Sequence, residues 1–277
     1  MSFGGVPVRD ALGSAMIAIG AAGSDTPRLD AELLLADALG VDRGALVCDP
    51  AREVTGPAVR AFQEAVRRRS AGREPVAYIL GRRGFRHIEL HVDERVLVPR
   101  PETELLVEVT LSLPAGARVV DVGTGCGAVA LALKHERPDL EVLGTDVSAA
   151  AVDVARENAA RLGLDVELVV GDLLAEVGEV DAVLSNPPYV EEGARETLPA
   201  EILRHEPPGA LFAGADGLDV IRRLAPAAAA AGAAMVAIEV GYGQAPAVAA
   251  LMRESGFERV ATRRDLAGIE RVVVGTS

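Results

Sequence analysis

The 277-residue sequence has no tryptophan, and only 3% of its residues are aromatic. Because 49% are still apolar, the core must be built mainly from alanine, valine and leucine. The length suits one large domain, or one domain with a smaller companion. The two cysteines, Cys48 and Cys126, are too few for a disulfide framework, which fits a reducing cytoplasm.

Positive charge is also scarce, with 28 Lys and Arg against 41 Asp and Glu. The formal net charge of −13 opposes a non-specific grip on the phosphates of nucleic acid. The N-terminal residues lack the charged and apolar regions of a signal peptide. The longest apolar tract, residues 224–240, contains Pro226, Gly232 and Glu239. We therefore expect it to form a helix, a turn and a strand, in a cytoplasmic protein without a membrane span.

Residues 1–75 are predicted to form a small helical domain. Apolar residues recur at helical spacing over 29–39, where Gly40 ends the helix, and again over 55–69. The arginines at 67–69 are expected to be a solvated helix end, favoured by the helix dipole, and not a nucleic-acid patch. Nothing in this part looks catalytic, so it could serve to recognise a partner.

A β-hairpin linker is predicted over residues 76–98. Residues 76–80 are expected to form its first strand, and the alternation over 88–92 its second. His87 and His91 lie four residues apart with no cysteine nearby, so we expect no metal site.

The remaining residues, 99–277, alternate between strands and helices. Thr103 or a neighbour can cap a helix over 105–113. The alternative is that the turn at 100–104 closes over the cofactor edge. Strands are predicted at 119–122, 142–145, 166–170, 182–185 and 233–240, and the clearest helix at 149–162. This pattern indicates an α/β fold with a doubly wound, mostly parallel sheet. Two later β runs, at 257–262 and 271–274, are expected to finish one edge as an antiparallel pair.

The most informative stretch is Asn186-Pro187-Pro188-Tyr189, directly after a predicted buried strand. The prolines cannot donate a backbone hydrogen bond, so they leave a rigid turn at a strand's carboxyl end, where ligands bind in such sheets. The Asn186 side-chain oxygen and a carbonyl of Pro187 or Pro188 can each accept a hydrogen from a substrate NH2 group. Tyr189 can stack on the flat group that carries this nitrogen. The tetrad therefore suits methylation of a planar nitrogen, which needs no strong base before attack.

A glycine-rich loop lies between the first predicted strand of the sheet and a helix that begins near Ala128. The spacing also fits a dinucleotide-binding loop, but Asp121 would repel a pyrophosphate. S-adenosylmethionine instead presents an ammonium and a sulfonium, which a carboxylate attracts. We expect this cofactor to contact the loop residues Gly123, Thr124, Gly125, Cys126 and Gly127, with Cys126 a small residue and not a nucleophile.

Polar residues at the next strand ends extend this site. Asp146 is placed for hydrogen bonds to ribose hydroxyls, and Asp172 for the adenine edge, with Leu173 packed on the ring. Each aspartate alone could be a strand-end cap. Together with Asp121 and the tetrad, in which Asn186 also borders the cofactor, they indicate an S-adenosylmethionine site without a metal.

These residues resemble the release factor glutamine methyltransferases, often called HemK or PrmC. The Asn-Pro-Pro-Tyr and glycine-loop motifs are shared with DNA and RNA amino-methyltransferases, whereas the Pro-Arg-Pro-Glu-Thr-Glu segment and the N-terminal helical module are more particular. The resemblance spans nearly the whole chain, through residues 68–72, 75–81, 98–104, 121–127, 186–189, 213–218, 239–244 and 265–268.

The resemblance implies a seven-stranded class I S-adenosylmethionine-dependent methyltransferase domain at 99–277. It implies methylation of the side-chain amide nitrogen (N5) of the glutamine in the Gly-Gly-Gln motif of peptide chain release factors. In the family the helical module and hairpin help to dock the release factor. The tetrad holds the amide, with Asn186, Pro187 and Tyr189 as catalytic residues. This chain departs from the family pattern at Arg86-His87 and at Leu173, where an aromatic residue sometimes covers adenine.

Two other functions stay open at this point. A nucleic-acid amino-methyltransferase, acting on adenine N6 or cytosine N4, would have to flip a base and hold the strand in a basic groove. The acidic balance opposes it. A catalytically idle cofactor-binding partner of the translation machinery is opposed by the intact tetrad.

Overall fold

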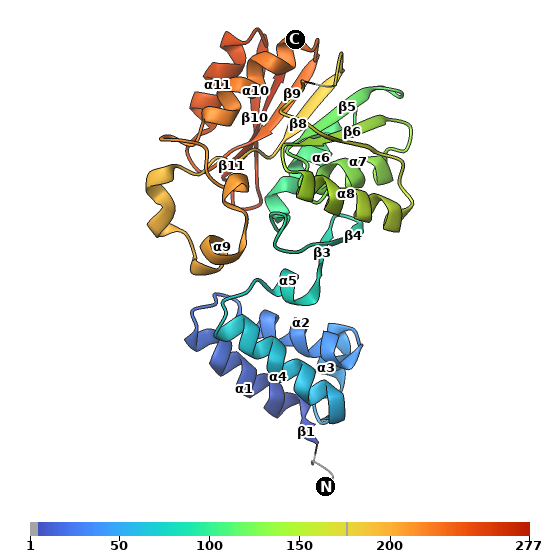
Figure 1. Cartoon of the computed structure of the whole chain (residues 1–277), viewed down its shortest axis with the longest axis vertical. Coiled ribbons are helices and arrows are strands. Elements are labelled where there is room, and N and C mark those ends of the chain that lie inside the picture. The colour runs from blue at the N-terminus through green and yellow to red at the C-terminus, as the bar shows by residue number, and fades with distance from the viewer. Residues whose placement is uncertain (1–4, 176) are drawn as a thin grey trace. The chain divides into compact units, whose positions relative to one another are not determined.

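The structure, a computed structural model, describes residues 5–175 and 177–277 (Figure 1). Residues 1–4, at the start of the predicted helical domain, and residue 176 lie outside the described residues. The chain divides into two compact units. The first contains residues up to 81 together with 199–205, and the second contains 82–198 and 206–277.

The first unit is mainly helical, as predicted for its sequence. Its core gathers Val8, Ile19, Leu34, Leu35 and Phe62. Its elements are β1 (Val6–Pro7), α1 (Val8–Ala21), α2 (Pro27–Leu39), α3 (Arg43–Cys48), β2 (Glu53–Val54), α4 (Gly56–Ser70), α5 (Val76–Leu80) and α9 (Ala200–His205). The short strands β1 and β2 pair antiparallel, and no pattern in the sequence predicted them.

The C-terminal end of α4 differs from the prediction. Arg69 is only 6% exposed, and its Nε lies 2.7 Å from Asp30 Oδ2 while its Nη1 lies 2.6 Å from Glu201 Oε2. The prediction of a solvated helix end is therefore wrong for Arg69. The reason is that Asp30, itself buried on α2, needs a charged partner inside the unit.

Residues 76–80 form helix α5, so the predicted strand is wrong. A five-residue apolar run is compatible with either a strand or a helical turn. Here Gly81 ends the helix in the left-handed conformation, with a φ of 68°, as helix C-caps often do. The hairpin therefore comes later, with β3 (Arg82–Phe85) paired to β4 (Ile88–His91).

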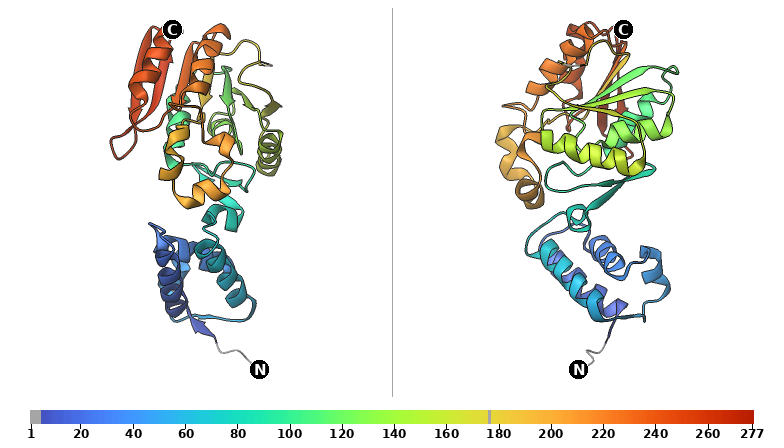
Figure 2. Two further views of the ribbon diagram at one scale, coloured as in Figure 1. Left: turned by 60° about the vertical axis from the view of Figure 1, so that its left-hand side comes forward. Right: turned by 45° about the vertical axis from the view of Figure 1, so that its right-hand side comes forward.

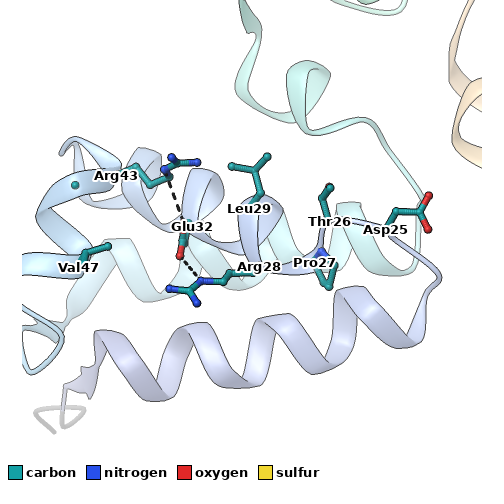
Figure 3. Close-up of a pocket in the computed structure, with 9 residues that line it drawn as sticks. Asp25, Thr26, Pro27, Arg28, Leu29, Glu32, Arg43 and Val47 are labelled. Carbon is teal, nitrogen blue, oxygen red and sulfur yellow. Dashed lines mark hydrogen bonds and ion pairs between the residues drawn. The ribbon is translucent and has the colours of Figure 1, made fainter. Parts of the chain in front are cut away.

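An open hollow of about 530 Å3 lies beside α2 and α3 of the first unit (Figure 3). Glu32 Oε1 accepts a hydrogen bond from Arg28 Nε at 2.8 Å, and its Oε2 lies 3.7 Å from Arg43 Nε. Leu29 and Val47 supply apolar wall. The single carboxylate of Glu32 is thus shared between the two arginines and offsets only part of their charge.

The second unit is built on one seven-stranded sheet, in the order β10-β11-β9-β8-β5-β6-β7 (Figure 1). Its strands are β5 (Arg118–Val122), β6 (Glu141–Asp146), β7 (Glu167–Val170), β8 (Ala182–Ser185), β9 (Met235–Glu239), β10 (Arg259–Arg264) and β11 (Glu270–Thr276). Strands β5 to β9 are parallel, and β11 pairs antiparallel with both β9 and β10. The predicted mostly parallel sheet with an antiparallel edge is confirmed.

Helices cover both faces of this sheet (Figure 2). Alternate residues of β5, Val120 and Val122, join Ile221 and Leu224 of one helix in the same core cluster. The helices are η1 (Pro101–Thr103), α6 (Glu104–Thr110), α7 (Ala128–Glu136), α8 (Ala149–Leu162), η2 (Glu192–Thr197), η3 (Pro208–Ala210), α10 (Asp219–Ala230) and α11 (Ala245–Glu254). No helix in the described parts of the chain is both long and apolar enough to cross a bilayer.

The strand order reverses direction between β5 and β8, the two central parallel strands. After β5 the chain moves outward to β6 and β7, whereas β8 lies on the other side of β5 and leads to β9. In open α/β sheets, ligands bind in the crevice beyond the carboxyl ends of the strands at such a reversal. This edge therefore positions the candidate site.

Candidate active site

A cavity of about 470 Å3 opens at the carboxyl ends of the parallel strands. This volume falls within the range of small-molecule sites, about 300–1,000 Å3. The predicted site residues that line it are Gly123, Gly125, Asp146, Asp172, Leu173, Asn186, Pro187 and Pro188. Further walls come from Arg95, Val96, Leu97, Val147, Ser148, Ala151, Pro207, Gly209, Ala210, Val220 and Arg223.

Asp146, the last residue of β6, faces this cavity from below the glycine-rich loop. Its Oδ2 accepts a hydrogen bond from the Gly125 backbone nitrogen at 3.0 Å, and its Oδ1 accepts one from the Ser148 nitrogen at 2.9 Å. Burial raises the pKa of the Asp146 carboxyl, and the two backbone hydrogen bonds oppose this rise. Asp146 thus joins the loop to the start of α8 and brings a carboxylate to the cavity wall.

Asp121 lies beneath the loop and does not line the cavity. Its side chain is buried, and its Oδ2 accepts hydrogen bonds from Thr124 Oγ1 at 2.7 Å and from the Ala130 backbone nitrogen at 3.2 Å. Burial raises the pKa of Asp121 to about 6. Asp121 therefore holds the loop against the first turn of α7, instead of presenting its carboxylate directly to a bound cation as we expected.

Three predicted loop residues stay away from the cavity wall. Thr124 and Cys126 are buried, and burial raises the pKa of the Cys126 thiol to about 12. Gly127 has a φ of 85°, and a Cβ atom there would lie 2.8 Å from a leucine methyl group of α7. The structure therefore gives Gly127 a packing role, and only Gly123 and Gly125 bring loop backbone to the cavity.

The next wall follows β7. Leu173 adopts a φ of 55°, unusual for a side chain of its size, and its carbonyl accepts a hydrogen bond from Thr145 Oγ1 at 2.9 Å. Asp172 forms an ion pair with Arg223 of α10, and both side chains are more than half exposed. The apolar Leu173 thus lies on the wall, while this ion pair lies at the solvent side.

The tetrad is held by the side chain of Thr103, which we had considered as a helix cap. Asn186 Nδ2 donates a hydrogen bond to Thr103 Oγ1 at 3.1 Å. The prediction that the Thr103 side chain caps the following helix is therefore wrong, because Thr103 is buried and makes no capping hydrogen bond. Asn186, Pro187 and Pro188 all line the cavity.

Tyr189 turns away from the cavity wall. Its hydroxyl lies 3.5 Å from Glu239 Oε1 at the end of β9, and its carbonyl accepts a hydrogen bond from Gln244 Nε2 at 3.0 Å. Burial, with the negative charge of Glu239, raises the pKa of the Tyr189 hydroxyl. The tetrad thus presents Asn186 and its prolines to the cavity and fixes its last residue at the next strand.

Sequence analysis did not predict that Pro207, Gly209 and Ala210 would line the cavity. Glu206 is buried, and its carboxylate oxygens lie 2.6 and 2.8 Å from Arg100 Nη2. This ion pair holds the segment 207–210, which lines the cavity. The only sequence signal was the Pro207-Pro208-Gly209 turn. Glu239 was missed as well, although it too ends a parallel strand.

The cavity fits S-adenosylmethionine. Glycine backbone allows close approach at Gly123 and Gly125, the Asp146 carboxylate can bind hydroxyl groups, and Leu173 offers an apolar surface to a flat base. Asp121 and Asp146 also make this strand edge acidic, which favours a cationic ligand. Among residues 5–175 and 177–277, no group of three or more His, Cys, Asp or Glu side chains could hold a metal ion.

Comparisons with known proteins identify the family and the fold of the chain. The family model of the Methyltransferase small domain matches residues 101–229, and that of the PrmC N-terminal domain matches residues 10–81. A solved 16S rRNA methyltransferase of T. thermophilus, in complex with AdoMet and guanosine, has a TM-score of 0.50 at 20% identity. The aligned residues make up 71% of this chain and 49% of the solved chain, and this likeness shows the fold alone.

Curated relatives cover far more of the sequence. A release factor glutamine methyltransferase of Caulobacter vibrioides is 43% identical over 263 residues, which are 92% of this chain and 91% of that protein. One of Deinococcus radiodurans is 42% identical over 273 residues, 96% and 97% of the two chains. Such identity over nearly the whole length shows that the chain belongs to the release factor glutamine methyltransferase family.

Proposed function

We propose that this protein transfers a methyl group from S-adenosylmethionine to the side-chain amide nitrogen of the glutamine in the Gly-Gly-Gln motif of peptide chain release factors. One observation carries the proposal beyond family membership. The Asn186 side chain lies on the cavity wall with its Nδ2 bound to Thr103, which leaves its Oδ1 to accept a hydrogen from a substrate amide. The two free cysteines, Cys48 and Cys126, are consistent with a cytoplasmic enzyme.

The cofactor supplies an electrophilic methyl group when it is bound. In our proposal the backbone of Gly123 and Gly125 borders the cofactor closely, and Asp146 accepts hydrogen bonds from its ribose hydroxyls. Asp172 binds the adenine edge and Leu173 packs on the ring. Thr124, Cys126 and Gly127, which we also assigned to cofactor binding, act by shaping the loop from beneath.

The substrate amide is held by the tetrad. Asn186 Oδ1 and the Pro187 carbonyl each accept one hydrogen of the glutamine NH2, which turns the nitrogen lone pair out of conjugation and toward the methyl group. As the new N–C bond would form, the S–CH3 bond of the sulfonium would break and the sulfur would leave as a neutral thioether. No base is required before attack, because the nitrogen becomes acidic only after it is alkylated, and it would then release one proton to water. Pro188 keeps the turn rigid. Tyr189 supports the end of the turn through the contact of its hydroxyl with Glu239.

The first unit is proposed to dock the release factor. It carries no residue of the cavity, and it occupies roughly the first 80 residues of the chain. Contacts remote from the reacting group can orient it and so raise the rate. The net charge of −13 makes a protein loop a more suitable substrate than a nucleic acid.

The direct test is to incubate the protein with methyl-labelled S-adenosylmethionine and a purified release factor, and to map the modified residue by mass spectrometry. Label on the glutamine of the Gly-Gly-Gln motif is expected, and a release factor with that glutamine replaced by alanine should stay unlabelled. DNA and RNA are offered in parallel. Label on an adenine or cytosine amino group, with the release factor inert, would support the nucleic-acid alternative instead.

A further inference from the structure

The last residue of β9, Glu239, has a buried carboxylate with few hydrogen-bond donors around it. Glu239 is 2% exposed, and its Oε2 has no hydrogen-bond partner among the described residues. The Thr103 hydroxyl is close enough to this carboxylate to lower its pKa by hydrogen bonding. Glu239 Oε1 lies 3.5 Å from the Tyr189 hydroxyl. A buried carboxylate with an unpartnered oxygen costs stability, so its position next to the tetrad calls for a functional reason.

Thr103 links this carboxylate to Asn186. A threonine hydroxyl has one hydrogen to donate and lone pairs to accept with. The Thr103 hydroxyl can donate its hydrogen to the neighbouring Glu239 carboxylate. Its oxygen accepts a hydrogen bond from Asn186 Nδ2 at 3.1 Å. Both side chains of this link, Thr103 and Glu239, are buried, so water does not compete for these bonds.

The direction of each hydrogen bond determines the next one. While Glu239 is a carboxylate it can only accept, so the Thr103 hydrogen must point toward it. The Thr103 oxygen can then only accept from Asn186, which must present its NH2 group to Thr103. The remaining atom, Asn186 Oδ1, is therefore left to the cavity. The reverse amide orientation would point an NH2 group at the substrate NH2 and would remove the acceptor that methyl transfer needs.

We propose that Glu239 and Thr103 are positioning residues that fix the orientation of the Asn186 amide, with its oxygen toward the substrate nitrogen. This inference rests on the proposed function and extends it to two residues that do not touch the cavity.

The charge state of Glu239 controls this orientation. Burial is the main reason that the pKa of Glu239 rises to about 7. Of the groups that face it, Glu102 of η1 raises this pKa further, while Arg271 of β11 and the hydrogen bonds from Thr103 and Tyr189 lower it. Once protonated, Glu239 can donate to Thr103, whose hydrogen is then free to turn toward Asn186.

Other charged groups near this point have partners of their own. Glu104 of α6 accepts a hydrogen bond from the Arg86 backbone nitrogen at 3.0 Å, and Arg100 is paired with Glu206. Arg271 Nε also lies 2.9 Å from Asp265 Oδ2. Because the remaining groups are engaged in this way, we expect one ionisation, that of Glu239, to change the orientation of the amide. Methyl transfer should therefore increase with pH through about 7.

The test compares Thr103→Val, Thr103→Ser and Glu239→Gln with the wild-type protein, with a release factor as substrate. Thr103→Val keeps the shape but removes both hydrogen bonds, and kcat should fall at least about tenfold with the affinity for S-adenosylmethionine unchanged. Thr103→Ser restores the hydroxyl and should recover most of the rate. Glu239→Gln should lose the rise of kcat with pH around 7, because a glutamine side chain does not ionise.

A double-mutant cycle separates positioning from a general structural role. If Thr103 acts only through Asn186, adding Thr103→Val to Asn186→Ala should leave the residual rate unchanged. Additive losses, a Thr103→Val variant with more than half the wild-type kcat, or a Glu239→Gln variant that keeps the pH dependence would each overturn the inference. These outcomes all require an active wild-type enzyme. A wild-type protein that does not methylate release factors would instead overturn the proposed function.

Discussion

Asp146 Oδ2 lies 3.0 Å from the backbone nitrogen of Gly125 and accepts its hydrogen bond. The end of β6 is thereby joined to the glycine-rich loop that follows the neighbouring strand β5. One carboxylate both shapes the loop and borders the cavity. Cofactor binding should therefore be more sensitive to this residue than to any member of the tetrad.

Asp146→Ala should weaken S-adenosylmethionine binding about 10- to 100-fold, the loss expected for one charge-assisted hydrogen bond worth roughly 1.5–3 kcal/mol. Isothermal titration calorimetry measures the change. Asp146→Asn keeps an oxygen that can accept the hydrogen bond from Gly125 but removes the negative charge. Its affinity therefore separates the effect of the loop contact from the effect of the charge. Asp153→Ala, on an exposed part of α8, is the matched control and should bind normally. Unchanged affinity in Asp146→Ala would contradict the ribose assignment.

Asn186→Ala should reduce the rate of methyl transfer by about 10²–10³, while the fold and most of the cofactor affinity are kept. The amide acts on the nitrogen as its geometry changes, so its contribution belongs mainly to the transition state. Single-turnover kinetics with a release factor gives the rate, and calorimetry gives the affinity. A variant that retains more than about a third of the wild-type rate would show that Asn186 is not the acceptor.

Glu239→Gln should change how stability depends on pH. In the folded protein the pKa of Glu239 is raised from 4.5 to about 7, so the folded state binds its proton more tightly than the unfolded state does. Wild-type stability is therefore lost as the pH rises from about 4.5 through about 7. The glutamine variant lacks this loss.

Urea unfolding at pH 5 and at pH 8 checks this expectation. Relative to wild type, the Glu239→Gln variant should gain stability between the two pH values, by an amount on the order of 3 kcal/mol. Asp121 also has a raised pKa, but it is present in both proteins and cancels in the comparison. Equal pH dependence of the two proteins would show that Glu239 titrates normally.

Deletion of residues 1–81 should reduce methylation of an intact release factor much more than it reduces S-adenosylmethionine affinity. All residues that line the cavity belong to the second unit, so cofactor binding should be kept. A short Gly-Gly-Gln peptide should be a poor substrate for both forms, because it lacks the remote contacts. Equal rates of the two forms on the intact release factor would exclude a docking role for the first unit.

The sequence predicted the sheet well, because strands such as β5 and β8 are short apolar runs between clear turn residues. It failed at residues 76–80, where the same kind of run forms a helix. A run of only five apolar residues does not distinguish a strand from a helical turn. Here the left-handed cap at Gly81 ends a helix. Strand ends were predictable for the same reason as the strands, which placed Asp146 and Asn186 at one edge.

The direction of side chains was less predictable. Asp121 and Asp146 both lie at strand ends, yet one points under the loop and the other borders the cavity. Arg69 looked like a solvated helix end, because its carboxylate partners come from distant parts of the sequence. Thr103 and Glu239 were overlooked as partners for the same reason, since their contacts form only when η1, β8 and β9 are brought together.

The position of α9 affects how the nascent chain folds. Glu201 is synthesised 132 residues after Arg69, the buried arginine to which it binds. When the first 81 residues have left the ribosome, Arg69 has Asp30 as a charged partner but still lacks Glu201. The first unit can therefore reach its final charge balance only after most of the sheet of the second unit has been translated.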